Sequence, residues 1–263
     1  MGTVFRAHDL RHNRAVAIKV LHAGVVSPDQ LRRFHREIEI AAGLNHPHIV
    51  PIYDSGVAAG VPYCVMPCID GESLRQRLRR EPQLPVAEAV DIARQAADAL
   101  HYAHDSGVIH RDVKPENLLL TRSHVLVADF GIATAMDGDD GLGTTSSQVV
   151  VGTPMYMSPE QASGAATLDA RCDIYGLGCV LYEMLAGQPP FSGPTVESVL
   201  RQHLALGAPP VTALRPAPPR RIATAVARAL AKTPAEDLGL TTPTSAGDHP
   251  PSMSSIIWSV ACP

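Results

Sequence analysis

A short run of the sequence gathers side chains that could bind and move a phosphate group. Asp112, Lys114 and Asn117 lie in the run HRDVKPEN at residues 110–117, and Asp129 follows in a DFG triplet. A carboxylate can accept the proton of a hydroxyl group, and an ammonium can neutralise phosphate oxygens. Carboxylate and amide oxygens are the hard ligands that Mg²⁺ prefers. The set suits phosphoryl transfer, which depends on positioning and charge neutralisation more than on covalent chemistry.

Two upstream residues extend this set. Lys19 ends the run VAIK at residues 16–19, within an expected strand. Glu37 lies within an expected helix and is the matching acid that could anchor the lysine. Each short motif is weakly diagnostic alone, because such motifs recur by chance. Their order, spacing and expected contexts together are hard to obtain by accident.

The combined pattern resembles the protein kinase family from Gly2 to about Glu236. The run GTPMYMSPEQ at residues 152–161 is most similar to the activation segments of bacterial serine/threonine kinases of the eukaryotic (Hanks) type. This resemblance implies a kinase that transfers the γ-phosphoryl group of ATP to serine or threonine hydroxyls of protein substrates.

The resemblance also implies a role for each residue. Asp112 would accept the proton of the substrate hydroxyl, and Lys114 would bind the transferring phosphate. Asn117 and Asp129 would hold two Mg²⁺ (or Mn²⁺) ions. Lys19 would bind the α- and β-phosphates of ATP and pair with Glu37. As an isolated residue, Lys19 would be interpreted as an exposed strand lysine, Asn117 as a loop cap and Asp129 as a turn former.

The adenine site is expected from two groups of residues. Val4, Ala17 and Leu119 fit the positions that sandwich the ring, although each could equally belong to the core. Met66 would control the back pocket, and Cys68 would lie in the hinge, where the backbone offers hydrogen bonds to adenine. The thiol of Cys68 is interpreted as packed and inert rather than reactive.

Regulation is expected around the activation segment. Arg111 resembles the arginine that binds a phosphate on that segment. The candidate acceptors are Thr145 and Ser147, followed by Thr144 and Ser146, and the alternative is that this run is merely solvated. The resemblance also implies structural roles for Phe130 in the DFG triplet and for Thr153, which would hydrogen-bond the catalytic loop. Glu160 would form an ion pair, and Asp173 would accept hydrogen bonds from backbone N–H groups.

Composition excludes other classes of protein. The 263-residue chain has a net charge of −4, which argues against a nucleic-acid binder with a broad basic surface. A local basic run, Arg75, Arg77, Arg79 and Arg80, is interpreted as a solvated helix face. Five cysteines without zinc-finger spacing fit a reducing compartment. No signal peptide or bilayer-spanning run is visible, so a cytoplasmic location is expected.

Hydrophobic periodicity predicts an α+β, bilobal fold. Strands are expected at 2–7, 15–21, 49–54 and 62–68, around one long helix from 27 to about 44. Helices follow at 84–104, 173–186, 195–205 and 220–232. The expected kinase domain spans 1–237, with an N-lobe at 1–66, a hinge at 67–71 and a C-lobe at 72–237. Residues 238–263 are expected to form a disordered tail rich in Pro, Ser and Thr.

Both ends depart from the family pattern. Gly2 fits only the last glycine of the glycine-rich loop, and the first strand and last helix are apparently missing. Glu160 would lack its arginine, because no arginine or lysine follows Lys232. A misassigned start and a late frameshift would explain both departures. They predict weaker ATP binding and leave homodimerisation for autophosphorylation doubtful. The alternatives to an active protein kinase are a weakly active or non-catalytic kinase-like binding module and a small-molecule kinase.

Overall fold

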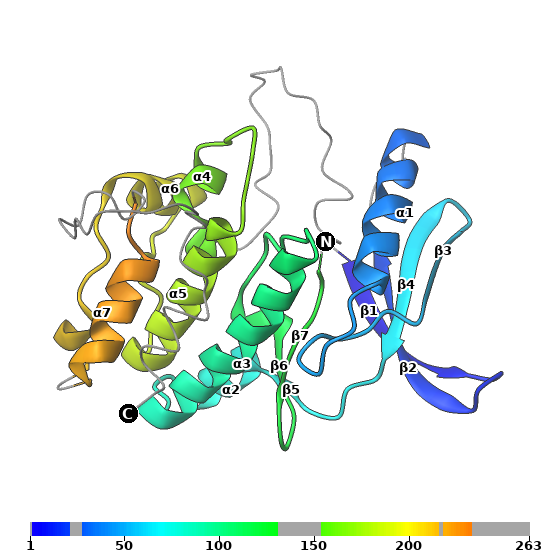
Figure 1. The fold of residues 1–263 in the computed structure, drawn as a ribbon, viewed down its shortest axis with the longest axis horizontal. Coiled ribbons are helices and arrows are strands. Elements are labelled where there is room, and N and C mark those ends of the chain that lie inside the picture. The colour runs from blue at the N-terminus through cyan, green and yellow to red at the C-terminus, as the bar shows by residue number, and fades with distance from the viewer. Residues whose placement is uncertain (1, 22–27, 131–153, 216–217, 233–263) are drawn as a thin grey trace, which may run out of the picture.

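The computed structural model describes residues 2–21, 28–130, 154–215 and 218–232, which form a strand-rich part and a larger helical part (Figure 1). The strand-rich part contains a four-stranded antiparallel sheet in the order β1-β2-β4-β3. Its strands are β1 (Gly2–Asp9), β2 (Arg14–Leu21), β3 (Asp54–Ala58) and β4 (Val61–Pro67). The expected α+β, two-lobed fold is thereby confirmed.

The first hairpin is fixed by a polar turn. The Asp9 carboxylate accepts hydrogen bonds from the backbone N–H groups of Arg11 at 3.0 Å and His12 at 3.1 Å. Asn13 adopts a left-handed φ of 49°, which asparagine tolerates better than most residues. This turn sets a register in which Val4 lies opposite Lys19.

Helix α1 (Pro28–Ala42) covers one face of this sheet. Its Phe34 and Ile38 are four residues apart, so they lie on one helix face, and both are buried against Leu21 and Cys64. The helix predicted from 27 to about 44 is therefore present, and it ends at Ala42.

The strand expected at 49–54 is wrong. Its apolar residues pair with the helical part instead, because the Val50 N–H donates to the Val127 carbonyl at 2.9 Å and the Val127 N–H donates to the His48 carbonyl at 2.8 Å. The strand forms later, at Asp54–Ala58. An apolar run shows that a segment is buried, but it does not show which lobe buries it.

The helical part is built around α3 (Val86–Asp105) and α5 (Arg171–Ala186), which pack against each other. Almost every residue of α5 is buried, as its apolar sequence predicts. The other α-helices that the structure describes in this part are α2 (Leu74–Arg80), α4 (Pro159–Ala162), α6 (Val196–Ala205) and α7 (Arg220–Ala229). No helix in the described ranges is long and apolar enough to cross a membrane.

A second, three-stranded sheet carries the chemistry-bearing loops. Its strands are β5 (Glu72–Ser73), β6 (Leu118–Leu120) and β7 (Val125–Val127), in that order. The run at residues 110–117 enters β6, and Asp129 lies two residues beyond the end of β7. Since β6 and β7 are antiparallel neighbours, the start of one lies beside the end of the other.

Candidate active site

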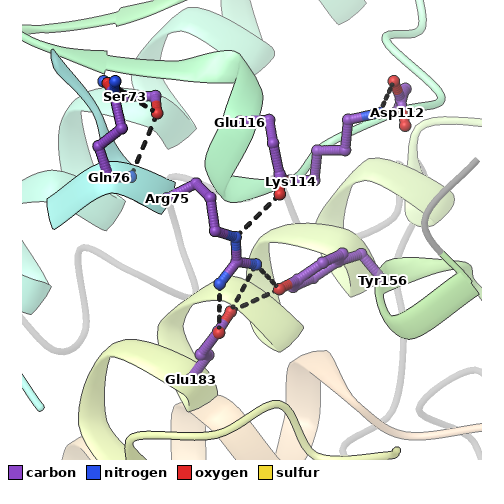
Figure 2. Close-up of polar contacts among 8 residues, drawn as sticks. All are labelled: Ser73, Arg75, Gln76, Asp112, Lys114, Glu116, Tyr156 and Glu183. Atoms are coloured by element: carbon purple, nitrogen blue, oxygen red, sulfur yellow. Dashed lines mark hydrogen bonds and ion pairs between the residues drawn. The ribbon is translucent and has the colours of Figure 1, made fainter. Parts of the chain in front are cut away.

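Three of the predicted residues form one hydrogen-bonded group. The Lys114 ammonium lies 2.6 Å from the Asp112 carboxylate (Figure 2). The Asn117 amide nitrogen donates to the Asp112 carbonyl at 2.8 Å and to its carboxylate at 3.1 Å. The short helix Pro115–Asn117 bends the chain so that these side chains converge. Because the Asn117 nitrogen makes both contacts, its amide oxygen stays available as a ligand.

A buried carboxylate holds this loop in an unusual backbone conformation. Asp173, at 1% exposure, accepts hydrogen bonds from the backbone N–H groups of His110 at 2.8 Å and Arg111 at 2.7 Å. His104 Nε2 lies 2.7 Å from the same carboxylate. Arg111 has a left-handed φ of 65°, and such strain persists only where surrounding contacts enforce it. The predicted role of Asp173 matches these contacts.

His110 joins the loop to the segment that carries Asp129. Its Nε2 donates to the Ala128 carbonyl at 2.8 Å, and its Nδ1 accepts from the Asp112 N–H at 3.2 Å. The ring also packs edge-on against Phe130, with ring centres 4.6 Å apart. One buried imidazole therefore couples the positions of Asp112 and Asp129.

Lys19 pairs with a different acid from the one expected. Its ammonium lies 2.7 Å from the Asp129 carboxylate, and no ion pair joins Lys19 to Glu37 in the part of the chain that the structure describes. Glu37 is half-buried on α1. Asp129 reaches the lysine from a left-handed backbone conformation with φ 69°. The sequence indicated the correct residue types but not their pairing.

The expected adenine residues occupy facing parts of the two lobes. Ala17 and Lys19 are two apart on β2 and therefore share one face of the sheet, and Met66 pairs with Ala17. Val4 pairs with Lys19 and is 58% exposed. Because Lys19 reaches Asp129, this face looks toward the loops of the helical lobe.

Leu119, Cys68 and Gly2 lie around this face. Leu119 is on β6, beside the loop that carries Asp112, and Cys68 follows β4 and is half-buried. Gly2 begins the edge strand, where an added Cβ would lie 2.5 Å from the Val20 carbonyl oxygen. The placement of all three is compatible with their expected roles.

Sequence comparison assigns this arrangement to a family. The protein kinase domain family matches residues 1–231. The chain belongs to the protein kinase domain family. This kinase chain is 44% identical over 240 residues to the serine/threonine-protein kinase PknB of Mycobacterium tuberculosis, covering 89% of the chain and 38% of the relative. It is 46% identical over 210 residues to PknB of Mycobacterium leprae, covering 78% of the chain and 33% of the relative.

A probable serine/threonine-protein kinase of Streptomyces coelicolor is 44% identical over 210 residues, covering 78% of the chain and 31% of that protein. The kinase chain thus spans about a third of the length of these relatives. The predicted resemblance to bacterial serine/threonine kinases is confirmed.

The kinase site also contains a residue that sequence reasoning misjudged. Arg75 is not part of a solvated helix face, since its side chain is only 17% exposed and contacts Glu116, Glu183 and Tyr156. Leu74 and Leu78 are the buried residues of α2, and Arg75 flanks this apolar stripe. The position of Arg75 beside these two leucines was the sequence signal that could have identified it as partly buried.

The other basic residues of α2 differ from Arg75. Arg77 pairs with Glu81 and Glu88, and Arg80 pairs with Glu72. Arg79 and Arg80 are both exposed and match the predicted solvated face. The basic run is therefore largely neutralised within the kinase.

The start of α4 is anchored to the loop that contains Arg111. Ser158 and Gln161 form a reciprocal capping box at the start of α4, and the Gln161 side chain donates to the Arg111 carbonyl at 2.7 Å. Glu160 is half-buried and has no ion pair with another described residue, so the full cost expected for a buried unpaired carboxylate does not apply. The predicted roles of Thr144, Thr145, Ser146, Ser147 and Thr153 lie outside the described residues.

Proposed function

We propose that this chain is an active serine/threonine kinase domain that transfers the γ-phosphoryl group of ATP to protein hydroxyls. The contact between Asp112 and Lys114 is the observation that carries the proposal. Asp112 accepts the proton of the attacking hydroxyl, and Lys114 neutralises charge on the transferring phosphoryl group. Lys19 binds the phosphates of ATP from the opposite lobe.

Divalent cations fit the donor set of this site. The Asn117 amide oxygen and the Asp129 carboxylate are hard oxygen ligands of the kind that Mg²⁺ and Mn²⁺ accept. The amide nitrogen of Asn117 is engaged with Asp112, which orients the oxygen away from the base. When bound, the metal neutralises charge on the phosphates of ATP.

Regulation by phosphorylation is part of the proposal. Arg111 Nε is buried and has no hydrogen-bond partner among the described residues. A phosphate on Thr145 or Ser147 would offer strong acceptors to such a guanidinium. Autophosphorylation between two copies of the chain would supply that phosphate.

The proposed domain limits and location remain those of the sequence analysis: a kinase domain at 1–237, a tail at 238–263, and activity in the cytoplasm. A non-catalytic binding module is not favoured, because Asp112, Lys114, Asn117, Asp129 and Lys19 are all present and connected.

Autophosphorylation with Mg²⁺ and ATP tests the proposed reaction. We expect the 263-residue chain to incorporate phosphate, and we expect Asp112→Asn, which keeps the shape but removes the base, to abolish incorporation. Chelation of the metal should also abolish it. Phosphosites at Thr145 or Ser147 would support the proposed regulation. A folded, monodisperse wild-type chain that incorporates no phosphate would overturn the proposal.

A further inference from the structure

Arg75 lies at the centre of a cluster that we call the Arg75 junction, defined as Arg75, Glu116, Tyr156 and Glu183 (Figure 2). Its Nε lies 2.8 Å from Glu116, and one of its terminal nitrogens lies 2.8 Å from Glu183. The other terminal nitrogen donates to the Tyr156 hydroxyl. The guanidinium therefore contacts three partners through three separate nitrogens held in one plane, whereas a lysine has a single nitrogen.

The junction connects parts of the chain that are far apart in sequence. Glu116 lies between Pro115 and Asn117 in the turn that follows the catalytic base. Tyr156 ends the short helix Pro154–Tyr156, just before the α4 capping box. Glu183 comes from the buried helix α5. Arg75 thus joins the turn that orients Asn117 to the segment that the family resemblance assigns to peptide docking.

Burial makes the junction sensitive to loss of one charge. Glu183 is buried, and Tyr156 donates its hydroxyl to the Glu183 carboxylate at 2.5 Å. Burial, together with the neighbouring Glu183 charge, raises the pKa of Tyr156, so the hydroxyl remains protonated. Burial opposes the charge of Arg75, but its contacts with Glu183 and Glu116 outweigh this and raise its pKa. The guanidinium therefore stays charged and compensates the buried acid.

A second contact shows how the docking segment is otherwise held. Gln161, which forms the α4 capping box with Ser158, donates to the Arg111 carbonyl at 2.7 Å. The Gln161 contact fixes the segment beyond Tyr156, whereas the Arg75 junction fixes Tyr156 itself. Loss of Arg75 would leave the catalytic turn and Tyr156 without their shared partner while Gln161 still held α4.

We propose that Arg75 is a positioning residue that sets the placement of the catalytic turn relative to the peptide-docking segment. The inference rests on the proposed kinase function. Arg75 does not touch the reacting atoms; it acts through Glu116 and Tyr156. Its loss should impair the use of protein substrate more than the binding of ATP.

Three variants separate positioning from simple charge compensation. Arg75→Met removes all three contacts and leaves Glu183 uncompensated. Adding Glu183→Gln removes the uncompensated charge but does not rejoin Glu116 to Tyr156. Arg77→Met is the matched control, because Arg77 lies on the same helix and, among the described residues, forms ion pairs with Glu81 and Glu88 rather than with the junction.

Steady-state kinetics and thermal unfolding are measured on all variants. We expect Arg75→Met to lower kcat/KM for protein substrate by about ten- to a hundredfold, without changing KM for ATP. In the Arg75→Met/Glu183→Gln variant, Tm should recover while kcat/KM stays low. Recovery of kcat/KM together with Tm would overturn the proposal, because Arg75 would then only neutralise Glu183. Arg77→Met should retain wild-type kinetics.

Hydrogen exchange gives a readout that does not depend on activity. In the Arg75→Met/Glu183→Gln variant, we expect faster amide exchange at residues 112–117 and 154–158 but not across α5. Wild-type protection of both segments would overturn the inference. An inactive wild-type chain would refute the proposed function, whereas the exchange measurement would still decide whether Arg75 positions these segments.

Discussion

At the scale of single residues, Asp173 shows how one carboxylate can define the backbone of the loop that begins at His110. Its two oxygens accept from His104, from His110 and from Arg111, and none of these contacts is available to water because the side chain is buried. An unpaired donor in such a place costs the full desolvation penalty. The Asp173 carboxylate therefore stabilises the left-handed backbone conformation of Arg111, which is unfavourable for a non-glycine residue.

Asp173→Asn should destabilise the kinase by about 1–3 kcal/mol, because an amide nitrogen would face an N–H donor. Urea unfolding measures this change. The matched control is Asp169→Asn, since Asp169 pairs with Arg171 near the surface, at 55% and 53% side-chain exposure. An exposed pair is worth about 1 kcal/mol or less. Equal losses in the two variants would contradict the assigned role of Asp173.

Residue types were predictable at this scale, whereas partners were not. The run HRDVKPEN indicates Asp112, Lys114 and Asn117 because their spacing within one loop brings them together. Lys19 is distant in sequence from both acids, so spacing could not decide between Glu37 and Asp129. Arg75 was missed for the same reason, because all its partners come from other elements.

At the scale of elements, α5 and α7 approach closely at a glycine. A Cβ added at Gly178 would lie 2.8 Å from the Ala229 Cβ, which is too close for real atoms. Gly178→Ala should therefore cost about 1–3 kcal/mol through overpacking. Chemical unfolding checks this value. Adding Ala229→Gly should restore part of the loss, whereas Gly207→Ala, with nothing within 4 Å of the added Cβ, should have little effect.

The buried His203 links α5 and α6 and should make stability depend on pH. Tyr175 contacts His203 Nδ1 at 2.9 Å, and Lys232 donates to the Tyr175 hydroxyl at 2.6 Å. Burial, followed by the Lys232 charge, lowers the pKa of His203 from 6.5 to about 4. Above pH 6.5 both folded and unfolded states hold the imidazole neutral. As pH falls from 6.5 toward 4, only the unfolded state binds the proton, so stability decreases.

The pKa difference of His203 corresponds to at most about 3 kcal/mol across this pH range. His203→Asn keeps an acceptor for Tyr175 but cannot titrate, so its unfolding free energy should fall less steeply with acid. Urea unfolding at several pH values compares the two slopes. Parallel profiles for the variant and the wild type would show that His203 does not titrate as proposed.

The positions of helices and strands were predictable where the hydrophobic pattern fitted only one kind of element. Helix α5 is apolar on all sides and could only be a buried helix. Residues 49–54 are equally apolar, but their pairing with Val127 depends on the helical lobe, which lies far along the chain. Register and sheet membership depend on such distant partners, and no local pattern contains them.

At the scale of the whole molecule, contacts on β7 and just beyond its end join the lobes. The segment after α1 contacts β7, because the Val50 N–H donates to the Val127 carbonyl and the Val127 N–H donates to the His48 carbonyl. In addition, the Lys19 ammonium on β2 lies 2.7 Å from the Asp129 carboxylate. Lys19 and Asp129 are also the residues proposed to bind the phosphates and the metal. Ligand binding at the site should therefore change how firmly the two lobes are coupled.

Mg²⁺ and ATP together should raise Tm more than ATP with a chelator. The metal adds the contact with Asp129 to the phosphate contact with Lys19, so the nucleotide binds the folded state more tightly and stabilises it more. The gain is about 2.7 kcal/mol at a ligand concentration of 100 Kd. Asp129→Asn should lose the metal-dependent part, because the amide is a weaker Mg²⁺ ligand and no longer pairs with Lys19. Differential scanning fluorimetry measures these shifts, with Asp169→Asn as a control that should respond like wild type. An undiminished metal-dependent shift in Asp129→Asn would contradict the assignment of Asp129 as the acid that couples the lobes through the bound nucleotide.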